Sequence, residues 1–428
     1  MSEESRGNLG ILVGGGPAPG LNGVISAVTI EARLKKIKVY GIYDGYKWLV
    51  RGDESRIEDH VRSLEIADVS RIHFDGGSIL RTSRTNPTRT ENGVANCVAN
   101  LRKLGIRYMV TIGGDDTSFG ASKIAQAAGG EIKFVHVPKT IDNDLPLPND
   151  LPTFGYQTAR ELGSTLVKNL MEDAKTTDRW YIAVAMGRHA GHLALGISKS
   201  AGATLAIIPE EFGAQQHIPI KNVCDILEGA ILKRRAMGNN HGVLVIAEGV
   251  GERLSAEELK KIPGVIVDYD NYGHLRLAEV ELGKIIKLEV EKRFRERGDK
   301  VQLVEINIGY VLRCADPIPF DQEYTRELGY NAVRYLFSQD PAHRKNAMIC
   351  VMNGRLKPLY FDEMIDPATG KTEVRLVDVS SDSYKIARNY MVRLEKNDFE
   401  DEAFLTRLSE QARMTTEEFV KNYHHLAE

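Results

Sequence analysis

Short apolar runs alternate with stretches of helical periodicity between residues 8 and 140 of the chain. Runs of four to six apolar residues bounded by glycine or polar residues predict buried strands, and the stretches between them predict helices. The strands are expected at Leu9–Val13, Val39–Ile42, Tyr108–Ile112 and Phe134–Val137, and the helices at Leu21–Leu34 and about Thr117–Ala128. This alternation indicates a mainly parallel sheet with helices on both faces.

The same alternation restarts after residue 155 and predicts a second α/β unit. Strands are expected at Tyr181–Met186, Thr204–Ile208, Val243–Ala247 and Val304–Tyr310, and helices at Tyr156–Asp173, His192–Ala201, Val223–Met237 and about Ala278–Arg297. The sequence therefore predicts an α/β protein of two doubly wound, mainly parallel-sheet lobes. The first lobe is expected at 1–153 with about 310–345, the second at 154–309 with an inserted helical segment 251–300, and a C-terminal extension at 346–428.

Polar residues gather directly after the predicted strands, where ligands of open parallel sheets bind. The first such loop, Gly14–Gly20, is rich in glycine and precedes a helix, so its N–H groups could cradle a phosphate. A tight strand-to-helix turn is the alternative. The loop has neither the GxGxxG nor the GxxxxGK[ST] pattern, so a dinucleotide fold or a P-loop is not indicated.

Two further loops of the first lobe carry acids and a cation. Asp115 and Asp116 end one strand and suit a Mg²⁺ ion, although acids are also common in the first turn of a helix. Lys139, Thr140 and Asp142 follow the next strand. Transfer of a phosphoryl group to an alcohol needs a base for the hydroxyl proton and positive charge for the phosphates. Asp142 could supply the first and Lys139 the second, and a polar turn is the alternative.

The second lobe offers cations and one acid at comparable positions. Arg188 follows Met186 and Gly187 at the end of one strand, and Glu248 follows another. Arginine suits bidentate phosphate recognition, and a carboxylate can accept hydrogen bonds from sugar hydroxyls. Each residue, taken alone, could equally be an ordinary surface group.

Composition narrows the class of protein. The 428 residues are 42% hydrophobic and 27% charged with a net charge of −3, which indicates a globular chain and gives no reason to expect nucleic acid or a membrane as partner. The four cysteines form no CxxC pair, so neither a disulfide framework nor a zinc site is expected. The polar N-terminus lacks the apolar core of a signal peptide, and a cytoplasmic location is predicted.

Together these motifs resemble the phosphofructokinase family over roughly residues 8–335. The matching segments are Gly15–Asn22, Gly76–Arg84, Gly113–Asp116, Pro138–Asp144, Met186–Gly191, Pro209–Glu211, Glu248–Gly249 and Gly309–Arg313, in the family's order. The resemblance implies phosphorylation of fructose 6-phosphate to fructose 1,6-bisphosphate, a step of glycolysis and gluconeogenesis. The active site is then expected in a cleft between a donor-binding and a sugar-binding lobe.

The resemblance also implies roles for single residues. Gly15, Gly16 and Arg84 are expected to bind the phosphoryl donor. Asp115 is expected to bind the Mg²⁺ ion, and Asp142 is expected to act as the base that takes the proton of the sugar hydroxyl. The sugar phosphate is expected at Thr140, Asp142, Arg179, Met186, Gly187, Arg188, Glu248, Tyr310 and Arg313. Arg179 matches an arginine that a neighbouring subunit contributes in bacterial members, so a homodimer or homotetramer is expected.

Two positions indicate pyrophosphate rather than ATP as donor. ATP-using members typically have glycine at the position of Asp116 and a small residue at that of Lys139, whereas pyrophosphate-using members resemble this chain at both. A carboxylate at Asp116 would repel the α-phosphate of a nucleotide, and Lys139 could stabilise the leaving phosphate. Tyr310, where ATP users commonly have histidine, favours the same donor.

The chain also departs from the family pattern. Val304 stands where bacterial ATP users carry a further phosphate-binding arginine. An ATP-dependent phosphofructokinase and a non-catalytic regulatory subunit of the family remain open, as does a NAD or lipid kinase with a similar GGD loop. The intact Asp115 and Asp142 argue against the regulatory subunit. The segments Lys139–Asp144 and Met186–Arg188 argue against the NAD or lipid kinase.

Overall fold

The computed structural model describes residues 7–148, 151–213, 215, 217–259, 281–363 and 373–427. Contacts divide the chain into two compact units. The first comprises Met1–Ala159 and Val311–Arg375, and the second comprises Arg160–Tyr310 and Leu376–Glu428. Residues beyond 345, expected as one extension, are thus divided between the two units. Part of the segment expected as an insertion, residues 260–280, lies outside the described residues.

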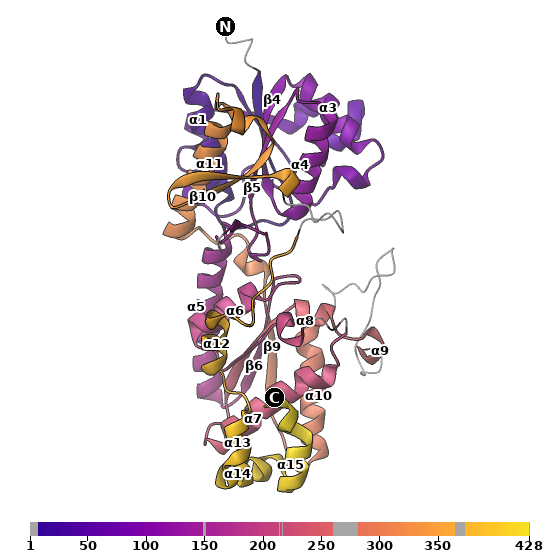
Figure 1. The fold of residues 1–428 in the computed structure, drawn as a ribbon, viewed down its shortest axis with the longest axis vertical. Helices are drawn as coiled ribbons and strands as arrows, with labels where there is room; N and C mark the ends of the chain where they lie inside the picture. The colour runs from indigo at the N-terminus through magenta and orange to yellow at the C-terminus, as the bar shows by residue number, and fades with distance from the viewer. Residues whose placement is uncertain are drawn as a thin grey trace. The chain divides into compact units, whose positions relative to one another are not determined.

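In the described part of the first unit, seven strands form one sheet in the order β11-β10-β5-β4-β1-β2-β3 (Figure 1). Their bounds are β1 (Asn8–Val13), β2 (Val39–Ile42), β3 (Val61–Leu64), β4 (Ile106–Gly113), β5 (Lys133–Pro138), β10 (Ala347–Met352) and β11 (Arg355–Tyr360). Strands β10, β5, β4, β1 and β2 pair in parallel, whereas β11 and β3 are antiparallel edges. The sheet is therefore mainly parallel, as the sequence predicts.

Helices cover both faces of this sheet because side chains alternate along its strands. The helices are α1 (Leu21–Leu34), α2 (Ile66–Val69), α3 (Gly93–Lys103), α4 (Asp115–Ala127) and α11 (Pro319–Leu336). Leu9 and Ile11 join the core formed with α1 and α11, whereas Leu12 faces the core formed with α3 and α4. Figure 1 shows the two helix pairs on opposite sides of the strands.

The second unit contains a smaller sheet in the order β7-β8-β6-β9, all parallel. Its strands are β6 (Trp180–Ala185), β7 (Leu205–Ile207), β8 (Gly242–Ala247) and β9 (Leu303–Ile308). The helices are α5 (Tyr156–Thr177), α6 (His192–Ala201), α7 (Ile220–Ala236), α8 (Gly249–Glu252), α9 (Ala256–Leu259) and α10 (Leu282–Glu296). Ile182 and Ile246 of the sheet share one core with α7 and α10.

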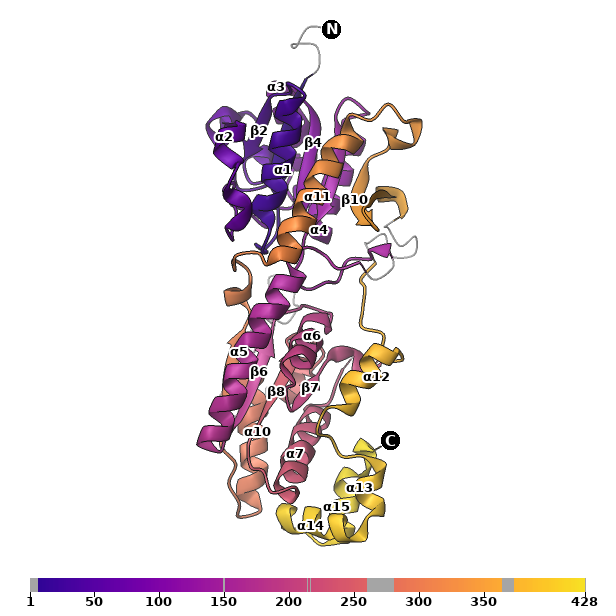
Figure 2. The same cartoon turned by 90° about the vertical axis from the view of Figure 1, so that its left-hand side faces the viewer.

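The C-terminal part of the chain adds four short helices to the second unit (Figure 2). They are α12 (Asp382–Asn389), α13 (Lys396–Glu400), α14 (Glu402–Ala412) and α15 (Thr416–Tyr423). Met391, Leu408 and Phe419 belong to the same hydrophobic core as α7 and α10. These helices are therefore part of the fold of this unit, although no sequence motif indicated them.

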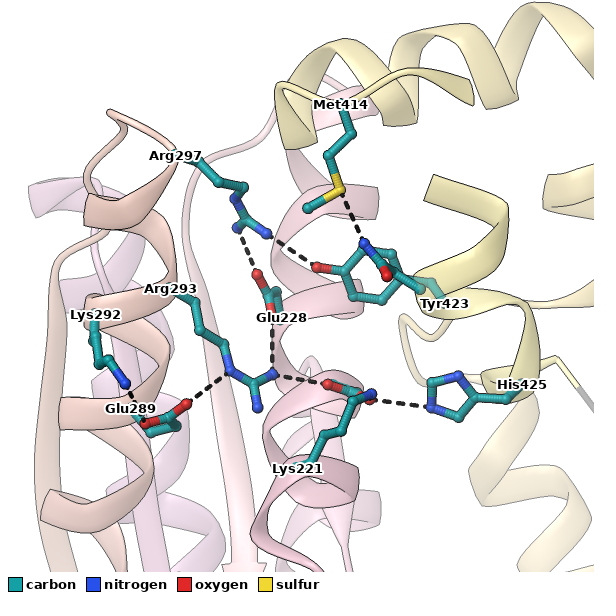
Figure 3. Close-up of polar contacts among 11 residues, drawn as sticks. Lys221, Glu228, Glu289, Lys292, Arg293, Arg297, Met414, Tyr423 and His425 are labelled. Carbon is teal, nitrogen blue, oxygen red and sulfur yellow. Dashed lines mark hydrogen bonds and ion pairs between the residues drawn. The ribbon is translucent and has the colours of Figure 1, made fainter. Parts of the chain in front are cut away.

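Polar contacts around two buried acids of α7, Glu228 and Asp225, link this helix to α10 and to Tyr423 and His425 near the C-terminus (Figure 3). Glu228 is only 1% exposed and pairs with Arg293 at 3.1 Å and with Arg297 at 2.5 Å. The Arg297 guanidinium also donates to the Tyr423 hydroxyl at 3.1 Å, and His425 lies 3.1 Å from the buried Asp225. Because each buried charge has a partner, removal of one would leave the other unpaired in the core.

Most expected elements occur within a few residues of their predicted bounds, and α1, β2 and α6 match them. The elements that were not predicted include helices α2, α3 and α11, strand β10 and the two antiparallel edge strands β3 and β11. None of the described helices combines the length and the apolar character that crossing a lipid bilayer requires.

Candidate functional site

Three neighbouring strands of the first unit bring their carboxyl-end loops to the same edge of the sheet. Strands β5, β4 and β1 are consecutive in the sheet and parallel. They lead into Lys139–Asp144, Gly114–Asp116 and Gly14–Gly20, respectively. The order of the strands therefore gathers the glycine loop, the acidic pair and the lysine-containing loop, which lie far apart in the sequence.

The glycine loop is held by the segment that precedes Arg84. Gly15 has φ of +81°, a conformation that favours glycine, and its N–H donates to the Ser83 carbonyl at 2.8 Å. The Thr82 hydroxyl donates to the Gly15 carbonyl at 2.7 Å. Because Ser83 is bonded to the loop, the exposed Arg84 follows directly beside it. The structure thus brings the backbone of Arg84 beside the loop, and its binding of the phosphoryl donor stays a prediction.

Two further cations contact the glycine loop. Lys139 is 4% exposed, and its ammonium group donates a hydrogen bond to the Gly16 carbonyl. The Arg313 guanidinium lies against Gly16, since a Cβ there would be 3.2 Å from Arg313 Cζ. We expected Arg313 among the residues that bind the sugar phosphate, and the structure places it at this loop. Backbone N–H groups and cations around one glycine loop are suited to bind a polyanion.

Asp115 and Asp116 begin helix α4, directly after Gly114. Asp115 is half-buried and Asp116 is exposed. The described residues contain no group of three histidine, cysteine or acidic side chains that could hold a metal by itself. Mg²⁺ is usually held by one or two carboxylates together with substrate phosphates and waters. A single carboxylate at the end of the strand next to the glycine loop fits this mode of binding.

The loop that carries Asp142 is fixed by hydrogen bonds within the first unit. Thr140, Asp142 and Asn143 are each 8% exposed. The Asp142 N–H donates to the Thr140 hydroxyl oxygen at 3.0 Å. Thr153 donates from its hydroxyl to the Thr140 carbonyl at 2.6 Å and from its N–H to Asn143 Oδ1 at 3.0 Å. The Asp142 carboxylate therefore extends from a backbone with little freedom to move.

His136 also supports these loops, although sequence reasoning did not single it out. Its Nε2 lies 2.9 Å from the Gly113 carbonyl and its Nδ1 lies 2.9 Å from the Thr111 hydroxyl. Complete burial lowers the pKa of His136 to about 3, so the ring is neutral at neutral pH. The neutral ring donates a hydrogen bond from Nε2 to the carbonyl of Gly113, one residue before the N-cap of α4. A histidine within an otherwise apolar strand was the sequence signal that could have indicated this supporting role.

In the second unit, Glu248 holds the loop after strand β6. Its Oε1 accepts hydrogen bonds from the N–H groups of Gly187 at 3.1 Å and Arg188 at 2.9 Å. Gly249 allows this approach, because a Cβ there would be 2.1 Å from the Arg188 carbonyl oxygen. Strands β6 and β8 are neighbours, which explains why residues at their carboxyl ends meet. Glu248 thus shapes the loop that presents Arg188.

Met186 and Tyr310 lie at the same edge of the second sheet. The Met186 N–H donates to the Ile308 carbonyl at 3.1 Å, and Ile308 ends strand β9. Tyr310 follows two residues later and is 75% exposed. The carboxyl ends of β8, β6 and β9 therefore bring together the residues predicted to hold the sugar phosphate, apart from Arg179 and those of the first unit.

Arg179 does not join this group within one chain. It precedes strand β6, whereas Met186 follows it. A strand of six residues is roughly 20 Å long. Val304, at the position of the missing arginine, pairs with Tyr181 near the same amino end of β6.

Arg375 contacts the loop that carries Asp142. It lies in the C-terminal part of the chain, where we recognised no sequence motif. Its Nη2 donates to the Asn143 carbonyl at 2.9 Å and its Nη1 to the Leu151 carbonyl at 2.9 Å. These partners lie more than two hundred positions earlier, so no local pattern could have indicated the contact.

The residues and strand order of the site agree with the family that the comparisons with known proteins indicate. The sequence model of a family described as "Phosphofructokinase" matches residues 8–336. The chain belongs to the phosphofructokinase family.

Relatives of this phosphofructokinase align over nearly the whole chain. It is 56% identical over 420 residues to a "Pyrophosphate--fructose 6-phosphate 1-phosphotransferase" from Thermotoga maritima, covering 98% of this chain and 99% of the relative. It is 49% identical over 426 residues to a protein of the same name from Naegleria fowleri, covering 98% and 96%. Phosphotransferases of this family generally need a divalent metal.

Solved structures support the fold of this phosphofructokinase. A pyrophosphate-dependent phosphofructokinase from Nitrosospira multiformis superposes with a TM-score of 0.61 at 16% identity, covering 90% of each chain. At that identity the likeness shows the α/β architecture and not the donor.

Proposed function

We propose that this phosphofructokinase transfers a phosphoryl group from pyrophosphate to the 1-hydroxyl of fructose 6-phosphate. The hydroxyl oxygen forms the new bond to phosphorus, and the bond from that phosphorus to the bridging oxygen of pyrophosphate breaks. The products are fructose 1,6-bisphosphate and phosphate, and the family resemblance implies that the reaction runs in both directions. The two relatives aligned over nearly the whole chain carry this activity in their names.

The structural observation that carries the donor assignment is the position of Lys139. Its buried ammonium group lies at the Gly16 carbonyl, within the loop that would bind the donor. A fixed cation there stabilises the charge that develops on the leaving phosphate. Asp116, exposed in the first turn of α4, places a negative charge where the resemblance puts the α-phosphate of a nucleotide.

Asp142 acts as the general base in this mechanism. Its backbone is held by Thr140 and by the hydrogen bonds of Thr153, so the carboxylate is oriented before substrate arrives. It takes the proton of the sugar hydroxyl as the oxygen attacks phosphorus. Lys139 and Arg84 stabilise the negative charge on the phosphates.

The second unit binds the sugar phosphate. Arg188 donates to the phosphate from a loop that Glu248 holds in place, and Tyr310 and Met186 lie at the neighbouring strand ends. That these residues and the donor loops line one cleft remains a prediction. The divalent metal is proposed to be Mg²⁺ held by Asp115 together with the phosphates, where it would neutralise their charge.

Arg179 is proposed to serve the sugar site of a neighbouring subunit. It lies at the amino end of β6, about a strand length from Met186 of its own chain. The resemblance implies the same arrangement, with a homodimer or homotetramer as the active form. The cytoplasmic location inferred from the sequence also remains a prediction.

The proposed function is tested by supplying pyrophosphate or ATP as the sole donor to the purified chain with fructose 6-phosphate and Mg²⁺. We expect turnover with pyrophosphate and at least 100-fold lower kcat/KM with ATP, the size of effect associated with one preorganised charge contact. Turnover with ATP alone would replace this proposal by the ATP-dependent one. A folded chain inactive with both donors would favour the regulatory subunit.

A further inference from the structure

The C-terminal part of the chain contributes a side chain to the loop that carries Asp142. Arg375 Nη2 donates to the Asn143 carbonyl at 2.9 Å and to Asn143 Oδ1 at 2.5 Å, and its Nε donates to the same carbonyl at 3.1 Å. Its Nη1 donates to the Leu151 carbonyl at 2.9 Å, and its own N–H donates to the Asp144 carbonyl at 2.8 Å. One residue therefore contacts both arms of the loop.

The loop needs donors of this kind because of its conformation. Asn143 has φ of +58°, which non-glycine residues seldom adopt, and it is 8% exposed. Buried carbonyls of such a turn require hydrogen-bond donors. A guanidinium carries five N–H donors in a planar fork, whereas a lysine ammonium is a single point, so arginine can satisfy several carbonyls at once.

The contacts of Arg375 continue through the loop to Asp142. Asn143 Oδ1, which accepts from Arg375, also accepts from the Thr153 N–H at 3.0 Å. The Thr153 hydroxyl donates to the Thr140 carbonyl, and the Thr140 hydroxyl oxygen accepts from the Asp142 N–H. Asp142 is also the covalent neighbour of Asn143. The orientation of the proposed base is thus tied to a residue 233 positions further along the chain, from 142 to 375.

We propose that Arg375 is a positioning residue for phosphoryl transfer, which holds the Asp142 loop in its reactive geometry. This inference rests on the proposed function of Asp142 as base. Arg375 itself contacts backbone and Asn143 rather than the reacting atoms. Loss of its contacts lets the carboxylate move, and displacement of a catalytic group by about 1 Å can lower a rate about 100-fold.

Three variants of the full chain test the proposal, each with a control for folding. Arg375→Ala removes every side-chain contact, and Arg375→Lys keeps the charge but not the fork. Arg253→Ala is the matched control, because Arg253 donates to the carbonyls of Pro209, Gly213 and Gln215 in the second unit. The measurements are kcat and KM for each substrate, the melting temperature, and kcat with added guanidinium.

We expect Arg375→Ala to lower kcat by about 10- to 100-fold while each KM changes by less than about threefold. Arg375→Lys should restore only part of the loss, and added guanidinium should raise the kcat of Arg375→Ala severalfold. Arg253→Ala should lower the melting temperature without this loss of kcat or this rescue. If Arg375→Ala does not fold, a loss of kcat in a folded Arg375→Lys, with each KM changed by less than about threefold, supports the proposal.

Two outcomes would overturn it. One is a folded Arg375→Ala variant with kcat within about twofold of the wild type. The other is a loss of kcat that guanidinium does not rescue and that Arg253→Ala reproduces. Asp142→Asn is measured alongside to separate the two proposals. An inactive Asp142→Asn with a normal Arg375→Ala refutes only the positioning role, whereas an active Asp142→Asn refutes the assignment of the base.

Discussion

The ammonium group of Lys139 donates a hydrogen bond to the backbone carbonyl of Gly16. The two residues lie on different loops, at the carboxyl ends of β5 and β1. Because β4 separates these strands in the sheet, the long lysine side chain reaches across the loop of β4 to the glycine loop. A cation at this point can contact a pyrophosphate without any adenosine group.

The first prediction concerns the phosphoryl donor. Replacing Lys139 and Asp116 together by glycine should lower kcat/KM for pyrophosphate by about 100- to 1,000-fold, because the preorganised cation that stabilises the leaving phosphate is lost. The KM for fructose 6-phosphate should stay within about threefold. Steady-state kinetics with each substrate varied in turn measure both effects. Pyrophosphate kinetics equal to those of the wild type would refute the donor assignment.

The second prediction concerns the base. Asp142→Asn keeps the size of the side chain but cannot accept the sugar proton, so kcat should fall by at least about 100-fold. The melting temperature should change little, because the backbone of the loop is held by Thr140 and Thr153. Turnover and thermal unfolding are measured on the same preparation. Near-normal turnover would remove Asp142 from the mechanism.

The third prediction concerns the sugar-binding loop. Glu248→Ala removes the acceptor for the N–H groups of Gly187 and Arg188, and hydrogen bonds to charged groups contribute about 1.5–3 kcal/mol each. We expect the KM for fructose 6-phosphate to rise at least about tenfold, while the KM for pyrophosphate is unchanged. Glu248→Gln keeps one acceptor oxygen, so its KM for fructose 6-phosphate should lie between those of the wild type and Glu248→Ala. Equal changes in both KM values would contradict a role confined to this loop.

The fourth prediction concerns the pH dependence of stability. The pKa of His136 is about 3 in the folded chain because the ring is buried, against about 6.5 in the unfolded chain. Below pH 6.5 the unfolded state binds a proton that the folded state does not, so the free energy of unfolding falls as pH decreases towards 3. The loss from this one group is roughly 3 kcal/mol at pH 4.5.

His136→Gln should remove this part of the pH dependence. The measurement is the difference in the free energy of unfolding between wild type and variant, from urea denaturation at pH 7.0, 5.5 and 4.5. The difference should shrink as pH decreases, because only the wild type loses stability through His136. His217→Gln, at an exposed histidine, is the control. A constant difference between wild type and His136→Gln would contradict the prediction.

Among the described residues, local pattern was enough to predict four of the seven strands of the first sheet and all four strands of the second. Strand β2 and helices α1 and α6 occur at the predicted residues because their apolar positions repeat with the period of the element they form. The edge strand β11 was not predicted, since it is largely half-buried or exposed and contains a proline. Its pairing with β10 depends on a neighbour and not on its own hydrophobic pattern.

The sequence by itself determined which chemical groups follow which strands, and the parallel topology then gathers Gly15, Lys139 and Asp142 at one edge of a sheet. Only the tertiary structure decided that Arg313 lies against Gly16, that Glu248 holds the Arg188 loop, and that Arg375 holds the loop of Asp142. The physical reason is that a pattern in the sequence reports only on residues close together along the chain. Periodicity reflects neighbours within one turn or strand, whereas Arg375 and Asn143 are 232 residues apart and meet only after the chain has folded.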